Sequence, residues 1–208
     1  MFYLKMFLVI VISYLFGSVP WALVIGKVFY HKDIRLEGSG NLGATNAGRV
    51  LGKPAAIAVT VLDALKAFFS MMIAHFLLPG FEIYAGLACC IGHCFPVFAQ
   101  FRGGKAVATS YGFLLGICVF LTQRYFLQFF IPIICFFAVL YLTKMVSLSS
   151  IASIGAAVLI SFVLSFMGKI DISIAVSLLV LWAFVTYRHR ANIERIRNGT
   201  ESKVKWMG

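Results

Sequence analysis

Residues 55–78 read AAIAVTVLDALKAFFSMMIAHFLL, and this stretch decides the fold class. A transmembrane helix needs about 20 predominantly apolar residues, and the only carboxylate and ammonium groups in this run are those of Asp63 and Lys66. The run begins directly after Pro54 and stops at Pro79-Gly80. The stretch therefore predicts a helix that crosses a membrane.

The rest of the chain has the same character. Of its 208 residues, 62% are hydrophobic and 12% are charged, whereas soluble domains are about half apolar and a quarter charged. A domain of this size cannot bury such an excess in water. The net charge is +11, and the basic residues lie between the apolar runs and in the tail. This distribution favours anionic lipid headgroups or a phosphorylated substrate, rather than nucleic acid, as the expected partner.

The apolar runs predict an all-α integral membrane protein, a single domain over residues 1–208. At about 20 residues per crossing, we expect a bundle of about seven transmembrane helices. Besides 55–78, the expected spans are 4–28, 83–98, 106–122, 126–142, 151–167 and 172–187. Pro96 and the Gly103-Gly104 pair leave open that spans 83–98 and 106–122 are broken or re-entrant helices. The first run lacks a signal-peptide cleavage site, so we expect it to stay as an uncleaved helix.

Seven spans put the termini on opposite sides, and the positive-inside rule orients them. With the C-terminus inside, the basic residues of segments 27–53, 102–105, 144 and 188–205 are cytoplasmic, and only Lys5, Arg124 and Lys169 are outside. We therefore expect an external N-terminus and a cytoplasmic C-terminus. The polar segments 31–54, 99–105 and 188–205 then share the cytoplasmic face, where a functional site is expected.

The first polar segment has the composition of a phosphate-binding loop. It reads EGSGNLGATNAGRVLG from Glu37, and glycines such as Gly38 and Gly40 let the backbone curl close to a ligand. The side chains that could bind a ligand here are those of Ser39, Asn41, Thr45, Asn46 and Arg49. Backbone N–H groups and an arginine suit a phosphate. The segment matches neither the Rossmann fingerprint nor a Walker loop, so nucleotide binding is not predicted.

The second segment reads GHCFPVFAQFRGGKAVAT from Gly92. We expect Gly103, Gly104 and Lys105 to open the next helix, because a helix start presents free N–H groups and a positive dipole to an anion. His93 lies near the same end. The alternative is a plain helix start with a lysine at the headgroup level.

The third segment reads RHRANIERIRNGTES from Arg188. His189 could act as a base or bind phosphate oxygens, and Asn192 follows one turn later, on the same face of a helix. The alternative is a basic amphipathic tail that lies on the headgroups.

Asp63 and Lys66 are three residues apart in a span, so we expect them to form a structural ion pair. The five cysteines lie in apolar stretches without a CxxC pair, which indicates packing. The sequence contains no metal-ligand cluster and no redox motif, so no metal or cofactor is expected.

These segments resemble the three motifs of the bacterial acyl-phosphate-dependent glycerol-3-phosphate acyltransferases. The first span carries Gly17-Ser18-Val19-Pro20, similar to that family's GS-[IV]-P. The three motifs correspond to Gly38-Ser39-Gly40-Asn41-x-Gly43-x-Thr45-Asn46-x-x-Arg49, to Gly92-His93-x-x-Pro96-x-Phe98-x-x-Phe101-x-Gly103-Gly104-Lys105-x-Val107-Ala108-Thr109, and to Arg188-His189-x-x-Asn192-Ile193-x-Arg195-x-x-x-Gly199-x-Glu201. One departure is visible, since the family's D-x-x-K-G reads Asp63-x-x-Lys66-Ala67 here.

The resemblance implies a multi-pass enzyme of the bacterial cytoplasmic (inner) membrane. Such an enzyme passes an acyl group from acyl phosphate to the 1-hydroxyl of glycerol 3-phosphate, which begins phospholipid synthesis and links it functionally to an acyl-phosphate-producing enzyme. The residues implied as catalytic are Ser39, Arg49, Lys105, His189 and Asn192. Those implied in substrate binding are Gly38, Gly40, Asn41, Thr45, Asn46, His93, Gly103 and Gly104. Glu201 is implied as a structural anchor of the tail.

The residues leave part of the mechanism open. The proton acceptor is either His189 or a substrate phosphate oxygen. Ser39 either forms an acyl-enzyme or hydrogen-bonds a substrate; we favour direct transfer, because acyl phosphate is already activated. A transporter for a phosphorylated anion is the rival class, but no inverted repeat is visible and the polar residues gather on one side.

Overall fold

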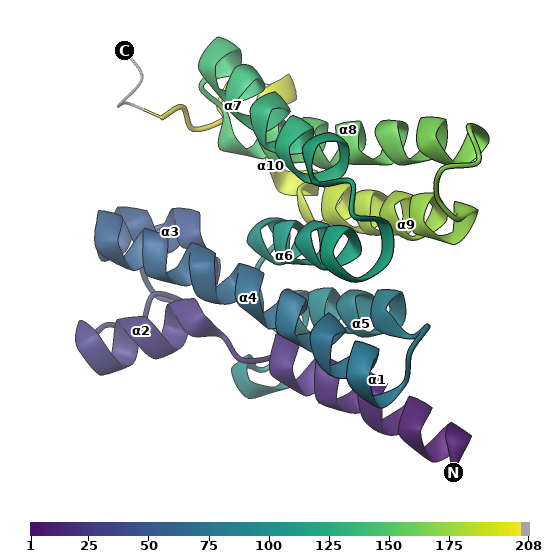
Figure 1. Ribbon diagram of the computed structural model, residues 1–208. Helices are drawn as coiled ribbons and strands as arrows, with labels where there is room; N and C mark the ends of the chain where they lie inside the picture. The colour runs from purple at the N-terminus through teal and green to yellow at the C-terminus, as the bar shows by residue number, and fades with distance from the viewer. Residues whose placement is uncertain (205–208) are drawn as a thin grey trace. The chain divides into compact units, whose positions relative to one another are not determined.

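The computed structural model describes residues 1–204, so Lys205, counted above among the cytoplasmic basic residues, lies outside the described residues. The chain divides into two compact units, Met1–Gly116 and Ile117–Gly208. The regular structure of the described residues is helical throughout, as Figure 1 shows. The all-α prediction is confirmed.

The first unit is organised around one long helix, α4 (Lys53–Leu77), which packs against other helices of the unit. The remaining elements are α1 (Phe2–Gly17), α2 (Trp21–Phe29), α3 (Ala44–Val50), α5 (Glu82–Cys94), the 3-10 turn η1 (Val97–Ala99) and α6 (Val107–Ile117), whose last residue begins the second unit. A short turn at Pro79-Gly80 joins α4 to α5, so the two helices form a hairpin. The start of α4 and the end of α5 therefore lie at the same end of the hairpin.

Glycines let α1 and α5 pack backbone to backbone. A Cβ atom on Gly17 would overlap the backbone of Cys89, and one on Gly92 would overlap the carbonyl oxygen of Tyr14. Small residues are the usual means of close helix contact in membranes. The Tyr14 hydroxyl adds a hydrogen bond of 2.8 Å to the carbonyl oxygen of Phe95. Beyond Gly17 the chain breaks at Pro20, and α1 and α2 are bent by 43°. The break between the two helices can be seen in Figure 1.

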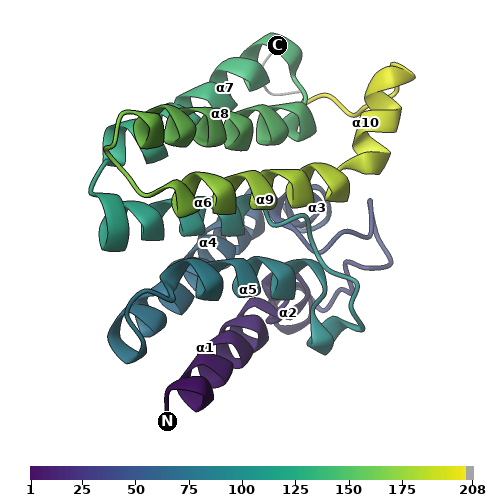
Figure 2. The same ribbon diagram turned by 90° about the vertical axis from the view of Figure 1, so that its right-hand side faces the viewer.

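The second unit packs α8 (Val146–Phe166) against α7 (Ile131–Thr143) and α9 (Ile172–Arg188). Two π-helical turns, η2 (Cys118–Thr122) and η3 (Phe126–Phe130), precede α7. The buried Gln128 amide of η3 donates to the Ser161 hydroxyl at 2.9 Å. The last helix, α10 (Arg190–Arg197), is bent by 61° relative to α9. Figure 2 shows this change of direction at the end of α9.

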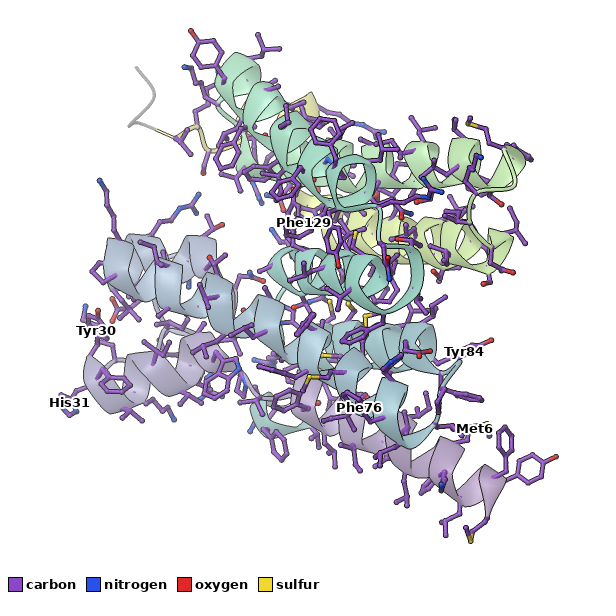
Figure 3. The ribbon with its side chains drawn as sticks, in the orientation of Figure 1. Met6, Tyr30, His31, Phe76, Tyr84 and Phe129 are labelled. Atoms are coloured by element: carbon purple, nitrogen blue, oxygen red, sulfur yellow. The ribbon has the colours of Figure 1, made fainter. Side chains whose placement is uncertain are left out.

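Within residues 1–204, four helical segments are long and apolar enough to cross a membrane, and up to six if each bent pair, α1 with α2 and α9 with α10, counts as one span. These six correspond to six of the seven expected spans. The seventh, expected over 106–122, is an apolar helix over Val107–Thr122 that is shorter than the others. Phe76 and Tyr84, labelled in Figure 3, are 75% and 56% exposed, as expected for side chains that face lipid.

Candidate functional site

The first polar segment folds around the side chain of Asn46. Its amide oxygen accepts the Ser39 N–H at 2.8 Å, and its amide nitrogen donates to the carbonyl oxygens of Ile34 and Glu37. Asn46 itself is 1% exposed. The family resemblance implied that Asn46 binds substrate. In this structure, its amide hydrogen-bonds the backbone of the loop and holds the loop together.

Glycine is required at Gly38, where the backbone has a φ of 60° and a Cβ atom would overlap the Asn46 amide oxygen. Gly40 has a φ of 66°. Residues other than glycine rarely adopt such angles. The glycines thus shape the loop that displays the exposed Ser39 between them.

Thr45 and Arg49 lie four residues apart on α3, so they share one face of the helix, and both are exposed. Asn41 and Gly43 are half-buried where the loop enters α3. The loop therefore turns Ser39, Thr45 and Arg49 outward, while Asn46 points into it.

Carboxylates of the same segment pair with cations other than Arg49. Asp33 accepts two hydrogen bonds from Arg35 Nε, at 2.9 and 3.2 Å, and one from Nη2 at 2.6 Å, and Lys32 pairs with Glu37 at 3.1 Å. The Arg35 hydrogen bonds hold the pKa of the Asp33 carboxyl well below its usual value. Among the described residues, no ion pair uses Arg49, so its guanidinium is available to an anion.

The second segment is packed onto the end of α5. A Cβ atom on Gly103 would overlap the carbonyl oxygen of His93 and the ring of Pro96, and one on Gly104 would overlap the His93 ring. The Gly104 N–H donates to the His93 carbonyl oxygen at 3.1 Å. Both glycines are buried, and their lack of side chains lets the loop lie directly against α5.

The expectation that Gly103-Gly104-Lys105 opens a helix was wrong. The helix α6 begins at Val107, and Ala106 has a φ of 58°, in the left-handed region. A residue in that conformation separates the loop from the helix. Lys105 therefore lies in the loop before the helix, where it is half-buried.

The first and second segments meet in one core. Ala99 of η1 packs in a single buried cluster with Ile34 and Leu42 of the first loop and Ala47 of α3. Their common position follows from the α4–α5 hairpin, because the first segment leads into α4 and the second leaves α5. The structure thus brings the two predicted phosphate-binding segments together at one end of this unit.

Three buried titratable side chains lie next to the Gly103-Gly104 loop, which is called the glycine loop below. Lys66 Nζ is 2.9 Å from Asp63 Oδ1, 2.8 Å from His93 Nδ1 and 3.2 Å from the carbonyl oxygen of Val19. Lys66 and Asp63 are 1% and 2% exposed. The expected pairing of Asp63 with Lys66 is present, and it extends to the glycine loop through His93.

The third segment belongs to the second unit, and Glu201 is its centre. Glu201 Oε1 accepts hydrogen bonds from the Asn192 amide and the Ser147 hydroxyl, both at 2.7 Å, and Oε2 accepts one from Arg195 Nε at 2.8 Å. Burial alone would raise the pKa of Glu201, but these hydrogen bonds outweigh it and lower the pKa. The carboxylate therefore fastens the tail to α8 and α10.

His189 ends α9 and is 2% exposed. Its Nδ1 lies 2.8 Å from the carbonyl oxygen of Val185, and because a carbonyl only accepts, Nδ1 carries the proton. The remaining ring nitrogen, Nε2, is then the one that can accept a proton when the ring is neutral.

Two partners in these networks were missed from the sequence. Ser147 gave no signal beyond being one of several serines in an apolar helix. For the Val19 carbonyl, the sequence signal was Pro20. A proline breaks the helix and leaves nearby backbone groups without a helical hydrogen bond, so that they bond other partners. By contrast, a hollow of about 450 Å³ lined by Met6, Phe7, Ile10, Phe81 and Tyr84 involves the beginning of α5 and none of the predicted site residues.

Comparison with known proteins places this geometry in a family. The model of the glycerol-3-phosphate acyltransferase family matches residues 7–199. The glycerol-3-phosphate acyltransferase of Listeria monocytogenes serotype 4a (strain HCC23) is 46% identical over 212 residues, which cover 98% of this chain and 99% of that protein. The corresponding protein of Geobacillus kaustophilus (strain HTA426) is 46% identical over 202 residues, with 97% of each chain covered.

Comparison with solved structures gives the same family. The fold is similar to that of PlsY (YgiH), an integral membrane glycerol 3-phosphate acyltransferase, in its glycerol 3-phosphate form, with a TM-score of 0.83, 33% identity and coverage of 95% of this chain and 94% of that one. The lysophosphatidic acid form of the same protein gives a TM-score of 0.81 and 32% identity over the same shares. The present chain belongs to the glycerol-3-phosphate acyltransferase family of integral membrane proteins.

Proposed function

We propose that this chain transfers an acyl group from acyl phosphate to the 1-hydroxyl of glycerol 3-phosphate, giving 1-acylglycerol 3-phosphate (lysophosphatidic acid) and phosphate. The observation that carries this proposal is the fold match, over 95% of the chain, to a relative solved in forms with glycerol 3-phosphate and with lysophosphatidic acid. The motif resemblance supplies the donor. An enzyme that makes acyl phosphate must then deliver it to this protein, and the acyl chains remain among the membrane lipids.

Arg49 is proposed to neutralise phosphate charge. An arginine binds two phosphate oxygens at once through its planar fork, and the carboxylates of its own segment pair with other cations. Ser39, Asn41 and Thr45 are proposed to hydrogen-bond the substrates from the same loop. The Gly38–Gly40 backbone, held by Asn46, fixes the position of these groups.

Lys105 and the backbone of Gly103 and Gly104 are proposed as a second phosphate-binding element, with His93 behind it. Both substrates carry a phosphate, so two such elements are expected. The two elements lie on one buried core, which supports their acting on the same pair of substrates.

The chemistry then requires little covalent participation by the protein. Acyl phosphate is an activated anhydride with a good leaving group, so positioning and charge neutralisation can supply most of the rate. We propose direct attack by the substrate hydroxyl, with Ser39 as a hydrogen-bonding group. His189 is proposed as an active-site residue whose Nε2 accepts a proton or contacts a phosphate. Asn192 is proposed to act beside it, held by its hydrogen bond to Glu201, the anchor of the tail.

The donor is tested with purified protein in liposomes, supplied with labelled glycerol 3-phosphate and one acyl donor at a time. We expect lysophosphatidic acid with acyl phosphate and none with acyl-CoA or acyl carrier protein. A control omits the protein, because acyl phosphate hydrolyses and acylates amines unaided. Turnover with acyl-CoA at a comparable kcat/KM would contradict the proposed donor.

Arg49→Lys separates a forked contact from a plain positive charge. Because an ammonium cannot reproduce the two-pronged contact, we expect kcat/KM to fall by at least about tenfold, the equivalent of one charge-assisted hydrogen bond. Arg197→Lys, on the exposed surface of α10, is the matched control and should leave kcat/KM unchanged. An Arg49→Lys enzyme with wild-type kcat/KM would show that charge alone suffices.

We also propose that the N-terminus is external and that the site faces the cytoplasm. The charge asymmetry supports this orientation. With Val107–Thr122 as a seventh crossing, the termini fall on opposite sides. The hairpin of α4 and α5 puts the first two polar segments on the same side, consistent with their shared charge.

Orientation is measured by cysteine labelling of intact cells, after replacement of Cys89, Cys90, Cys94, Cys118 and Cys135. A membrane-impermeant maleimide should label a cysteine at the exposed Lys169 position at once, and one at the Lys203 position only after permeabilisation. The opposite pattern would invert the proposed topology, and labelling of both positions in sealed cells would show that α9 does not cross the membrane.

A further inference from the structure

The buried Lys66 ammonium has three partners: it hydrogen-bonds His93 Nδ1 and the Val19 carbonyl oxygen, and it forms an ion pair with Asp63. They come from three different elements: Asp63 from α4 itself, His93 Nδ1 from α5, and the Val19 carbonyl oxygen from the break between α1 and α2. Lys66 is 1% exposed and His93 is 7% exposed. The ammonium is thus enclosed by protein, with the Asp63 carboxylate 2.9 Å away.

The contact with His93 fixes which ring nitrogen carries the proton. A charged ammonium is a donor only, so at a Nζ–Nδ1 distance of 2.8 Å the proton in the contact belongs to Lys66 and Nδ1 accepts it. A neutral imidazole has one donor and one acceptor nitrogen. We propose that Lys66 and Asp63 are positioning residues that lock His93 in the Nε2–H tautomer and thereby turn a hydrogen-bond donor toward the Gly103-Gly104 loop.

The other side of the His93 ring lies against that loop. A Cβ atom on Gly104 would overlap His93 Nε2 and Cε1, and the backbone of the same two residues is joined by the 3.1 Å hydrogen bond from the Gly104 N–H to the His93 carbonyl oxygen. A donor at Nε2 supports acceptors in this region, namely loop carbonyls or the oxygens of a phosphate bound there. The functional part of this inference rests on the proposed function; the tautomer itself does not.

A competing arrangement is built into the same cluster. His93 Nδ1 is also 3.4 Å from Asp63 Oδ1, which could accept a proton from Nδ1. Without the Lys66 ammonium, this contact favours the Nδ1–H tautomer and leaves an acceptor facing the glycine loop. Lys66 therefore selects between two tautomers of His93. One turns an Nε2–H donor toward the glycine loop, and the other turns an Nε2 acceptor toward it.

The other histidines provide an internal reference. The chain has four histidines. The Nδ1 atom of His189 contacts the Val185 carbonyl oxygen, and that of His75 contacts a Glu82 carboxylate oxygen, both at 2.8 Å. Both partners are acceptors, so these two rings must carry a proton on Nδ1. Of the three histidines with a described Nδ1 partner, His93 is the one expected to lack that proton.

The experiment is nitrogen NMR of the full-length protein with ring-labelled histidine, in micelles or lipid at a pH where the rings are neutral. The His93 signals are assigned by their loss in His93→Gln, or by elimination with His31→Gln, His75→Gln and His189→Gln. We expect the pattern of an Nε2–H ring for His93 and of an Nδ1–H ring for His189. An Nδ1–H ring or a doubly protonated ring at His93 in the unmodified protein would overturn the proposal.

Lys66→Met adds the functional consequence. In this variant His93 should switch to the Nδ1–H pattern, and the KM for glycerol 3-phosphate should rise about tenfold, as for one lost hydrogen bond, with a smaller change in kcat. Lys169→Met, at an exposed lysine, is the matched control. If Lys66→Met does not fold, the spectrum of the unmodified protein still decides the tautomer. A folded Lys66→Met with unchanged tautomer and KM would refute the positioning role, whereas an inactive unmodified enzyme with the expected spectrum would count against the proposed function alone.

Discussion

The Lys66 ammonium is the constraint on which the first unit depends. A charge buried in a membrane protein is tolerated only where partners surround it, and here the partners come from α4, α5 and the break after α1. The site needs these three elements in fixed positions, because α4 follows the Ser39–Arg49 loop and α5 precedes the glycine loop. Buried charged residues within an apolar helix thus hold the polar segments in place.

Glycine has a different role in each of the two loops. Gly38 is needed for a left-handed backbone angle that lets Asn46 close the loop. Gly103 and Gly104 are needed because His93 and Pro96 occupy the space where a side chain would go. At all three positions the space that a side chain would need is occupied by protein atoms, not left open for a ligand. The glycines shape the two loop backbones that carry the side chains of Ser39, Arg49 and Lys105.

The sequence predicted the helices well wherever an apolar run is long. The expected span 55–78 compares with Lys53–Leu77 in the structure, since lipid solvation alone dictates such a helix. The prediction failed where a single backbone angle decides the start of a helix. Ala106 has a left-handed φ, so α6 begins only at Val107. The sequence also did not predict that Asn46 closes the first loop, because a side chain suited to a ligand is equally suited to the loop's own backbone. Contacts such as that of Ser147 with Glu201 join residues 54 positions apart, and no local pattern encodes them.

The measurement that tests the central claim most directly is a double-mutant cycle on the buried pair. Asp63→Asn, Lys66→Met and the double variant are compared by their free energies of unfolding, from reversible SDS titration in mixed micelles. Breaking a buried pair strands a charge, so each single variant should lose about 3–5 kcal/mol. The double variant, with neither charge, should lose less than the sum of the two by at least about 1–3 kcal/mol. Additive losses, with no coupling between Asp63 and Lys66, would show that the ammonium does not organise this unit.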